Sequence, residues 1–499
     1  MPKPTPLSVL PKGTRLLCGG DLTIEVPDEV AERFRPGDAV VVVEATAEVL
    51  LIPEAERRLA REAVGSAEAA FASVSAASDA AISRFFERFA EQLESEAIWS
   101  AIEQANHEDV ADAERRDRST TRLATSADMR RGMIAGLRGW ARAPSRRGQV
   151  LERVEHDGWT TELVGAALGV VAFVFEGRPN VLADATGVVR GGNCVVFRIG
   201  RDALRTAKAI MRSALTPALA DAGLPEGTVR LLESAEHAAG WALFGDRRLS
   251  LAVARGSGPA VATLGAIARQ AGVPVSLHGT GGAWIVAAQS ARAERLGAAI
   301  ADSLDRKVCN TLNTLCLPRA RAAELVPVAL RALEQAGQRL GEPYKLHIVE
   351  GSEQFLPAEL FAREVAVHRA HGVVKERQVE RLPEAELGHE WEWERTPEVT
   401  LTIVDDVDHA VALFNRYSPQ FIASLVSEQP DEHERFYAAV NAAFVGDGQT
   451  RWVDGQKALD RPELGLSSWQ SGRLFGRGGI LSGDGVYTVR TRAQTRDGR

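Results

Sequence analysis

Short apolar strands alternate with helices from about residue 163 to residue 288, and this alternation is the feature that most constrains the fold. The strand VVAFVF is followed by NCVVFRIG and then by the helical stretch RDALRTAKAIMRSALTPALADAG, which ends at Gly223 and Pro225. The segments VRLLES, LSLAVA, VPVSLHG and AWIVAA continue the pattern. Strands that alternate with helices form mostly parallel sheets covered on both faces, so we predict a doubly wound α/β domain here.

A second α/β segment begins at about Lys307. It contains VCNTLNTLCLP, KLHIVE, EVTLTIVDD, the helix DHAVALFNRYS and the strand FIASLVS. Within it, the polar and Pro-bounded stretch 376–397 is typical of a surface loop. A chain of 499 residues is long enough for several domains, and we expect a second parallel sheet in this segment.

Two different patterns precede the first sheet. Residues 54–142 carry apolar side chains at three- and four-residue steps, which predicts packing helices. Residues 12–53 contain β-branched stretches broken by Pro and by the turn Pro36-Gly37-Asp38, which predicts a small β module. This module resembles the swapped-hairpin DNA-binding domains of bacterial transition-state regulators, but it has no basic stripe. We therefore favour docking or dimerisation over DNA binding.

Composition narrows the functional classes. Lys plus Arg is 59 against 67 for Asp plus Glu, a net charge of −8 that disfavours a general nucleic-acid surface. Four scattered cysteines give no disulfide framework and no zinc pattern. The longest apolar run, 163–175, has 13 residues, against about 18 for a membrane span. We expect a cytoplasmic protein without a metal, nucleic-acid or membrane partner.

Cys309 is the first candidate for chemistry. It lies in DRKVCNTLNTLC, after a helix that begins near Arg292 and before an apolar strand. Arg306 and Lys307 beside it would stabilise the thiolate form. A cysteine between two elements is also typical of a small buried hydrophobe, so the residue alone leaves both interpretations open.

A glycine-containing turn, Arg255-Gly256-Ser257-Gly258-Pro259, follows the strand LSLAVA. Such a turn exposes backbone N–H groups at a helix N-terminus, where a cofactor phosphate can bind. Val261 stands where the dinucleotide fingerprint requires Gly or Ala. An ordinary tight turn is an equal alternative.

The stretch 175–200 holds three further candidates. Asn180 follows Pro179, and its amide could donate to a developing oxyanion. Arg198 and Arg201 could hold an adenosine ribose or its 2′-phosphate. An asparagine after proline is also common in turns, and an arginine near a helix start is usually solvated.

The order of these segments resembles that of the glutamate-5-semialdehyde dehydrogenases, or γ-glutamyl phosphate reductases, of the aldehyde dehydrogenase superfamily. The resemblance runs from about Ser73 to Arg492 and is carried by EGRPN at 176–180 and VCNTLNTL at 308–315. It implies an aldehyde dehydrogenase-like fold of two doubly wound α/β domains. The implied parts are an NADP(H)-binding domain at 54–146 and 168–302, a catalytic domain at 303–475, oligomerisation segments at 147–167 and 476–499, and an added β module at 1–53.

The resemblance also implies roles for individual residues. Cys309 would be the nucleophile and Asn180 the oxyanion donor. NADP(H) would lie along Arg198, Gly200, Arg201, Gly256 and Ser257. The implied substrate-binding residues are Arg178, Asn310, Arg451 and Asp454, the last two from the segment QTRWVDG.

Departures from the family pattern bear on the acyl acceptor and the substrate. Hydrolytic members use a carboxylate to activate water, whereas residues 276–282 read SLHGTGG, which favours phosphate as the acceptor. The segments 305–308 and 456–482 also differ from the usual pattern of the reductase family. We expect NADPH-dependent reduction of L-glutamyl 5-phosphate, or a close analogue, in proline biosynthesis by a homodimer or homotetramer. A kinase or a carrier protein is the further partner that we consider. The alternative functions are a reductase of CoA- or carrier-bound acyl thioesters and a non-catalytic binding protein.

Overall fold

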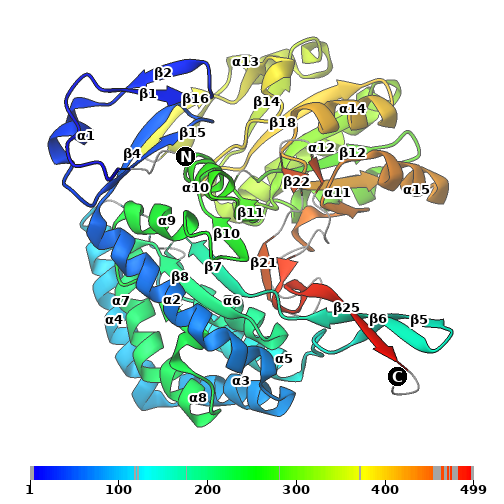
Figure 1. The fold of residues 1–499 in the computed structure, drawn as a ribbon. Coiled ribbons are helices and arrows are strands. Elements are labelled where there is room, and N and C mark those ends of the chain that lie inside the picture. Colours follow the sequence, from blue (N-terminus) through cyan, green and yellow to red (C-terminus); the bar gives the residue numbers. More distant parts are fainter. Residues whose placement is uncertain are drawn as a thin grey trace. The chain divides into compact units, whose positions relative to one another are not determined.

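The computed structural model describes residues 5–116, 118, 120, 123–175, 177–279, 281–369, 372–452, 462–465, 469–470, 473–474 and 481–495. The chain divides into two compact units, whose elements are labelled in Figure 1. Unit 1 comprises Met1–Gly279, Leu459–Gly465 and Leu481–Arg499, and unit 2 comprises Thr280–Ala458 and Leu466–Ile480.

Unit 1 is built on a five-stranded parallel sheet of order β11-β10-β7-β8-β9. Its strands are β7 (Val170–Phe175), β8 (Cys194–Ile199), β9 (Val229–Leu231), β10 (Leu251–Arg255) and β11 (Val275–His278). Every residue of β7 and β8 is buried, as expected for a parallel sheet covered on both faces. The strand order reverses between β7 and β10, and ligands of such folds bind at the carboxyl edge near this point.

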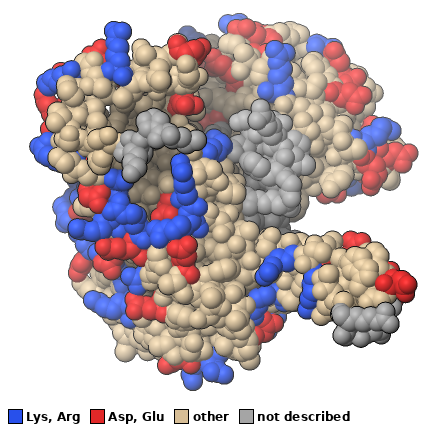
Figure 2. All heavy atoms as spheres, in the orientation of Figure 1, with Lys and Arg blue, Asp and Glu red and all other residues tan. Residues whose placement is uncertain are grey.

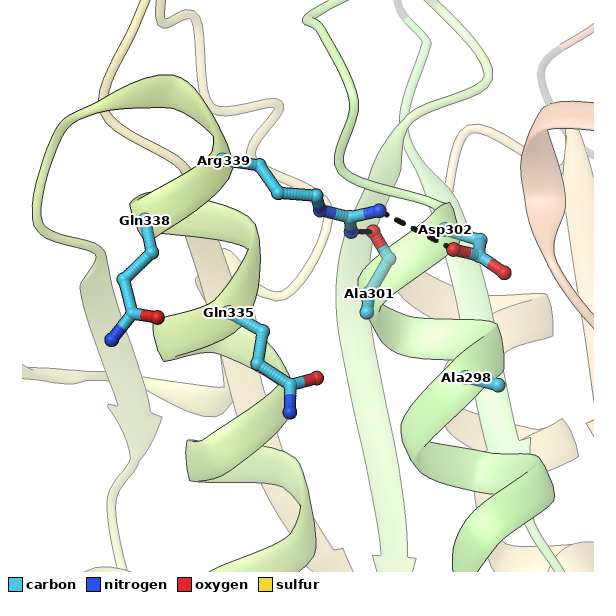
Figure 3. A pocket seen from close by; sticks show the side chains of 6 residues that line it. All are labelled: Ala298, Ala301, Asp302, Gln335, Gln338 and Arg339. Carbon is cyan, nitrogen blue, oxygen red and sulfur yellow. Dashed lines mark hydrogen bonds and ion pairs between the residues drawn. The ribbon is translucent and has the colours of Figure 1, made fainter.

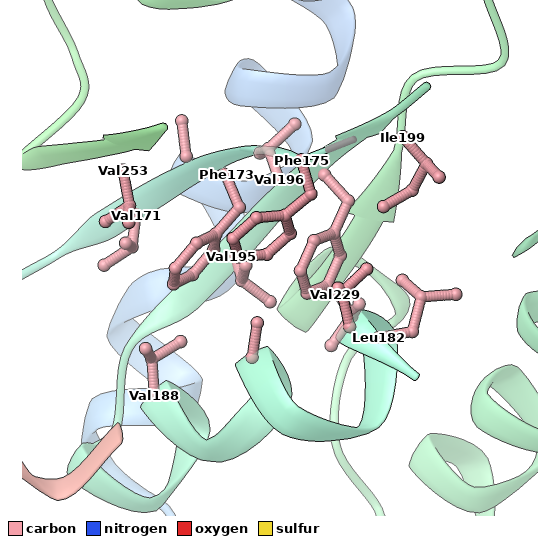
Figure 4. Packing of buried hydrophobic residues seen from close by; sticks show 14 of the residues in the cluster. Val171, Phe173, Phe175, Leu182, Val188, Val195, Val196, Ile199, Val229 and Val253 are labelled. Carbon is pink, nitrogen blue, oxygen red and sulfur yellow. The ribbon is translucent and has the colours of Figure 1, made fainter. Parts of the chain in front are cut away.

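Helices cover this sheet, and the helical periodicity of residues 54–142 is confirmed. The helices of unit 1 after the N-terminal module are α2 (Glu54–Ala76), α3 (Asp79–Glu94), α4 (Glu96–Glu114), α5 (Ala127–Arg142), α6 (Val181–Ala185), α7 (Leu204–Ile210), α8 (Thr216–Asp221), α9 (His237–Phe244) and α10 (Gly258–Gln270). Helix α2 packs across β7, β8 and β9, and α10 packs against β10 and β11. In Figure 4, Leu182 and Val188 point toward the side chains of the strands. Phe173 of β7 and Phe197 of β8 stack with ring centroids 5.7 Å apart.

The N-terminal module consists of two hairpins and a short helix. They are β1 (Arg15–Cys18), β2 (Leu22–Glu25), α1 (Asp28–Arg33), β3 (Ala39–Val43) and β4 (Glu48–Ile52). The β3-β4 hairpin is apolar on both faces: Val43 joins the main core of unit 1, whereas Val49 packs with Phe34 in the module. Gln270 of α10 donates a hydrogen bond to the Val42 carbonyl (2.9 Å). The hairpin therefore fastens the module to the rest of the unit.

A separate antiparallel sheet of order β25-β6-β5 contains parts of both predicted oligomerisation segments. Its strands are β5 (Val150–His156), β6 (Trp159–Ala166) and β25 (Thr488–Thr495). Glu162 is buried between Arg153 and Arg492, whose hydrogen bonds hold the pKa of this carboxyl below its usual value. Val154 and Trp159 remain exposed on this sheet.

Unit 2 contains a seven-stranded parallel sheet of order β17-β14-β18-β13-β12-β19-β20. Its strands are β12 (Ala283–Ala287), β13 (Leu312–Pro318), β14 (Lys345–Val349), β17 (Val379–Leu382), β18 (Glu398–Val404), β19 (Ile422–Val426) and β20 (Phe444–Gly446). The other elements are helices α11 (Ala293–Asp302), α12 (Ala322–Leu340), α13 (Ala358–Ala362), α14 (Val407–Tyr417) and α15 (Pro430–Ala439), the hairpin β15 (Glu364–Arg369) and β16 (Gly372–Arg377), and a two-stranded pair β22 (Trp469–Gln470) and β23 (Arg473–Leu474). The pair β21 (Glu463–Gly465) and β24 (Leu481–Ser482) belongs to unit 1.

Two sequence predictions are wrong here. The domain boundary falls between residues 279 and 280, not at 302, because β12 lies between β13 and β19 in the second sheet and α11 packs against α12. The stretch 376–397 is not simply a surface loop, because it contains the edge strand β17. The first error concerns the partners of a strand, which a local apolar pattern does not encode, and the second concerns a strand that lies in a polar stretch.

The surface carries mixed charge. In Figure 2, basic side chains on the face shown are interspersed with acidic ones. Ion pairs such as Arg61 with Glu54 and Arg248 with Asp246 account for part of this arrangement in unit 1. Among the helices of the described residues, none is long and apolar enough to cross a membrane.

The stacked aromatic core of unit 1 generates a stability prediction. Replacing Phe173 by Ala removes a fully buried ring from the central strand, and we expect a loss of about 3–5 kcal/mol in the free energy of unfolding. Urea unfolding followed by circular dichroism measures it. Tyr437→Ala, at an exposed position of unit 2, is the control and should change the midpoint little.

Candidate active site

The loop that carries Cys309 lies between α11 and β13 in unit 2. All four cysteines are among the described residues, and Cys309 is the one that is not buried. The loop is closed by Thr311, whose hydroxyl accepts from Val308 N (2.9 Å) and donates to the Arg306 carbonyl (2.7 Å). The Cys309 carbonyl accepts from Gly282 N (2.8 Å). The thiol is therefore presented from a defined turn.

Two glycines at the start of β12 make this turn possible. A Cβ added to Gly281 would lie 2.6 Å from both Cα and O of Cys309, closer than real Cβ contacts allow. Gly282 has φ +103°, a conformation that side chains disfavour. The segment that departs from the hydrolytic pattern thus has a structural role of its own, because it lets two backbone segments meet beside the thiol.

Glu390 is a site residue that sequence reasoning missed. Its Oε2 accepts a hydrogen bond from Gly281 N (2.5 Å), and its Oε1 is 2.5 Å from Lys307 Nζ. We expected Lys307 to support the thiolate, and the structure shows its ammonium paired with this carboxylate. The signal available in the sequence was the run HEWEWE, in which acidic and aromatic residues alternate inside a stretch assigned to the surface.

Asn313 fixes the residues on both sides of Glu390. Its Nδ2 donates to the His389 carbonyl (2.8 Å), and its Oδ1 accepts from Trp391 N (2.9 Å). The Trp391 ring stacks on His347 at 3.5 Å between centroids and donates from Nε1 to Thr400 (2.8 Å). The segment carrying Glu390 is thereby bound to β13, β14 and β18.

Asn310 and Arg451, both predicted to bind substrate, are brought together. The Arg451 guanidinium donates to Asn310 Oδ1 and, from Nε, to Asp305 (2.6 Å). Thr450 donates to the Asn310 carbonyl (2.7 Å), so the 3-10 helix Thr450–Trp452 supports the Cys309 loop. Both predicted side chains have partners within the protein, and Asp454 lies outside the described residues.

A second group of predicted residues lies at the carboxyl edge of the unit 1 sheet. Asn180 stands at the start of α6, and its Nδ2 donates to Asp184 Oδ2 (2.8 Å). Burial raises the pKa of Asp184 to about 6, against the lowering effects of Arg255, Asn180 and Arg178. One amide hydrogen of Asn180 is therefore held by a carboxyl inside the fold.

His278 ends β11 at the same edge and is neutral at physiological pH. Burial, followed by repulsion from Arg255 and Arg178, lowers its pKa to about 3. Its carbonyl accepts from Gly256 N (3.2 Å), which joins the ends of β10 and β11. This position of the sheet edge therefore carries neither a carboxylate nor a cation.

The residues predicted to bind NADP(H) share this edge. Arg198, the fifth residue of β8, is buried; Nη2 donates to the Ala235 carbonyl (3.1 Å), whereas Nε has no hydrogen-bond partner in the structure. Gly200 and Arg201 follow β8, and Ser257 is the first residue before α10, with a hydroxyl that caps no backbone N–H. The buried Arg198 N–H without an acceptor and, separately, the helix N-terminus at Ser257 both fit a polyanionic nucleotide.

A cavity of about 530 Å³ on unit 2 is separate from these residues. Figure 3 shows it between α11 and α12, where Arg339 points to the Ala301 carbonyl and to Asp302. None of the predicted site residues lines it. Among the described residues there is no His, Cys, Asp and Glu group suited to a metal ion.

The two α/β units agree with what comparison with known proteins finds. The model of the aldehyde dehydrogenase family matches residues 38–347, and the chain belongs to this family. It is an oxidoreductase that resembles the γ-glutamyl phosphate reductases. A γ-glutamyl phosphate reductase from Rhodopseudomonas palustris (strain BisB18) is 30% identical over 391 residues, which cover 76% of this chain and 82% of that protein.

Further matches agree. A γ-glutamyl phosphate reductase from Afipia carboxidovorans is 29% identical over 75% of this chain and 82% of that protein. The crystal structure of a γ-glutamyl phosphate reductase from Thermotoga maritima superposes with a TM-score of 0.75 at 22% identity, covering 88% of this chain and 99% of that one. The crystal structure of lactaldehyde dehydrogenase from Escherichia coli superposes with a TM-score of 0.59 at 17% identity, covering 92% of this chain and 96% of that one. The predicted aldehyde dehydrogenase-like fold is confirmed.

The close approach at Gly281 predicts the effect of one methyl group. In Gly281→Ala, Cβ would clash with the Cys309 backbone, which is held by its bond to Gly282, so the loop must shift. We expect the alkylation rate of Cys309 by iodoacetamide to change at least about threefold, with a lower unfolding temperature. Gly448→Ala is the control because nothing lies within 4 Å of its added Cβ. Unchanged alkylation would contradict the proposed tight contact.

Asp184 predicts a pH dependence of stability. Because its folded pKa is raised to about 6, above about 3.9 in an unfolded chain, the folded protein binds the proton more tightly. The resulting stabilisation is present below about pH 4 and lost as pH rises to about 6. Asp184→Asn removes this titration, so the wild type should lose stability relative to the variant across that interval in urea titrations. A constant difference at all pH values would contradict the assignment.

Proposed function

We propose that this enzyme reduces L-glutamyl 5-phosphate, or a close acyl-phosphate analogue, to the corresponding semialdehyde and phosphate, as in proline biosynthesis. The observation that carries the proposal is the similarity to curated γ-glutamyl phosphate reductases over about four fifths of their length. The partly exposed Cys309 supports it, because acyl-phosphate reduction requires an accessible nucleophile.

The proposed role of Cys309 follows from thiol chemistry. The thiolate attacks the acyl carbon, an S–C bond forms, and the bond to the phosphate oxygen breaks with its electron pair leaving on phosphate. Asn180 is proposed to donate its amide N–H to the oxygen that becomes negative during this attack. Cys309 then holds the acyl group as a thioester and is released as the thiolate when the aldehyde leaves.

NADPH is the proposed cofactor and, when bound, supplies the hydride. We infer that Ser257 and Gly256 would lie along its phosphates at the start of α10, with Gly200, Arg198 and Arg201 at the end of β8. The unpartnered Nε of Arg198 supports this placement because a nucleotide oxygen would supply its missing acceptor.

Phosphate is the proposed exchange partner of the thioester in the reverse direction. Water would need a general base. The segment 276–282, which resembles the segment that carries the carboxylate in hydrolytic members, has no carboxylate, and its His278 is neutral. Arg178, Asn310, Arg451 and Asp454 are the proposed substrate residues.

We also propose that the chain forms a homo-oligomer through the β25-β6-β5 sheet. Exposed apolar side chains on its strands, Val150, Val154, Trp159 and Val489, support this use. For residues 1–53 we propose docking or dimerisation.

Replacing Cys309 by Ser tests the mechanism. We expect NADPH oxidation with enzymatically generated glutamyl phosphate to fall by at least about 10³-fold, because the hydroxyl is a far weaker nucleophile. Cys18→Ser, in the N-terminal module, is the matched control and should retain activity. Full activity of the Cys309 variant would refute the mechanism.

The substrate is tested separately with the wild-type enzyme. Phosphate-dependent oxidation of glutamate semialdehyde, measured as NADPH formation, is expected, with little formation when phosphate is omitted. Reduction of acyl-CoA thioesters with no turnover of glutamyl phosphate would replace the proposed substrate class, and no cofactor binding by tryptophan fluorescence would indicate a non-catalytic protein.

A further inference from the structure

We propose that Glu390 is a positioning residue that fixes the Cys309 loop and offsets the charge of Lys307, so that the carboxylate–ammonium pair tunes the reactivity of the thiol. The inference rests on the proposed function in taking Cys309 as the nucleophile. It assigns a role to a segment outside the motifs that carry the family resemblance.

The carboxylate of Glu390 joins three segments that are distant in sequence. One oxygen accepts from the Gly281 N–H at the start of β12, and the other meets the Lys307 ammonium on the cysteine loop, both at 2.5 Å. A Cβ on Gly281 would lie 2.7 Å from Glu390 Oε1 and 2.6 Å from Cys309 Cα. The carboxylate and the cysteine backbone therefore flank the same glycine.

Burial strengthens the electrostatic interaction between Lys307 and Glu390. The side chains of Lys307 and Glu390 are 6% and 12% exposed, so solvent and salt screen them far less than a surface ion pair. Removing either partner would leave the other charge buried and unpaired next to the Cys309 loop.

Other charged side chains lie on both sides of the Cys309 loop. Arg306 precedes Lys307 on the same loop, and Glu392 approaches Lys307 at 3.9 Å from the exposed side. On the side of Asn310, Arg451 is paired with Asp305. Two nearby cations thus already have acidic partners, and Glu390 is the more buried partner of Lys307.

The same contacts argue against Glu390 as a base for water. Both of its oxygens already accept hydrogen bonds, one from the Gly281 N–H and one from the Lys307 ammonium, so these contacts already occupy the carboxylate. Instead, the two carboxylate oxygens hold Gly281 and Lys307 in place. The segment around it is itself fixed by Asn313.

The test is the pH-dependent alkylation rate of Cys309 by iodoacetamide in the full-length protein, followed by mass spectrometry. Glu390→Gln keeps an acceptor for Gly281 but removes the charge, so Lys307 should stabilise the thiolate and raise the rate below the thiol pKa by roughly three- to tenfold. Lys307→Met should lower it by a similar factor. The double variant Lys307→Met/Glu390→Gln should return to within about twofold of the wild type.

Matched controls separate electrostatics from local unfolding. Glu394→Gln makes the same charge change at an exposed position of the same segment and should leave the rate unchanged. Lys307→Arg keeps the charge and should stay near the wild type. The buried Cys18, Cys194 and Cys316 should remain unmodified in folded variants.

Single variants that both raise or both lower the rate would overturn the proposal and indicate a purely structural contact. So would a rate that no variant changes. Because alkylation requires no substrate, these results are independent of the activity of Cys309→Ser, which tests the proposed function.

Discussion

Burial of parallel strands on both faces is the constraint on which the rest of the structure depends. In β7, β8, β12 and β13 every residue is buried, so the middle of each of these strands is covered and a ligand can be reached only near the edges of the sheets. The candidate polar groups therefore lie at or just beyond the ends of strands. Asn180 and the turn at Gly256 follow β7 and β10, Arg198 is the residue before the last in β8, and the Cys309 loop precedes β13.

Local patterns were sufficient for those elements whose chemistry is local. Strand–helix alternation and the segments EGRPN and VCNTLNTL led to the family and the fold, which are confirmed, and to Cys309, which stays a predicted nucleophile. The assignment of β12 failed because AWIVAA is equally suited to either sheet, and only its pairing with β13 and β19 decides between them. Glu390 was missed for a related reason: it meets Gly281 and Lys307 across 109 and 83 residues, and its neighbours read as polar surface.

Two of the segments that we expected to differ from the family pattern meet in space. Lys307, in the segment 305–308, is paired with Glu390, and Gly281, in the segment 276–282, lies against both that carboxylate and the Cys309 backbone. Positions that are far apart along the sequence therefore belong to one contact network within unit 2. Because residues in contact are coupled energetically, we expect a substitution at one of these positions to change the effect of a substitution at another.

The two-faced β3-β4 hairpin has a consequence for how the N-terminal segment can evolve. Its residues complete the hydrophobic interior of unit 1 on one side and that of the small module on the other. Deleting or exchanging residues 1–53 as a cassette would strip cover from helices α9 and α10, which hairpin strands contact. The family match beginning at residue 38, just before β3, fits this division. We therefore expect the residues before the hairpin to tolerate exchange, whereas substitutions in the hairpin itself would also disturb the core of unit 1.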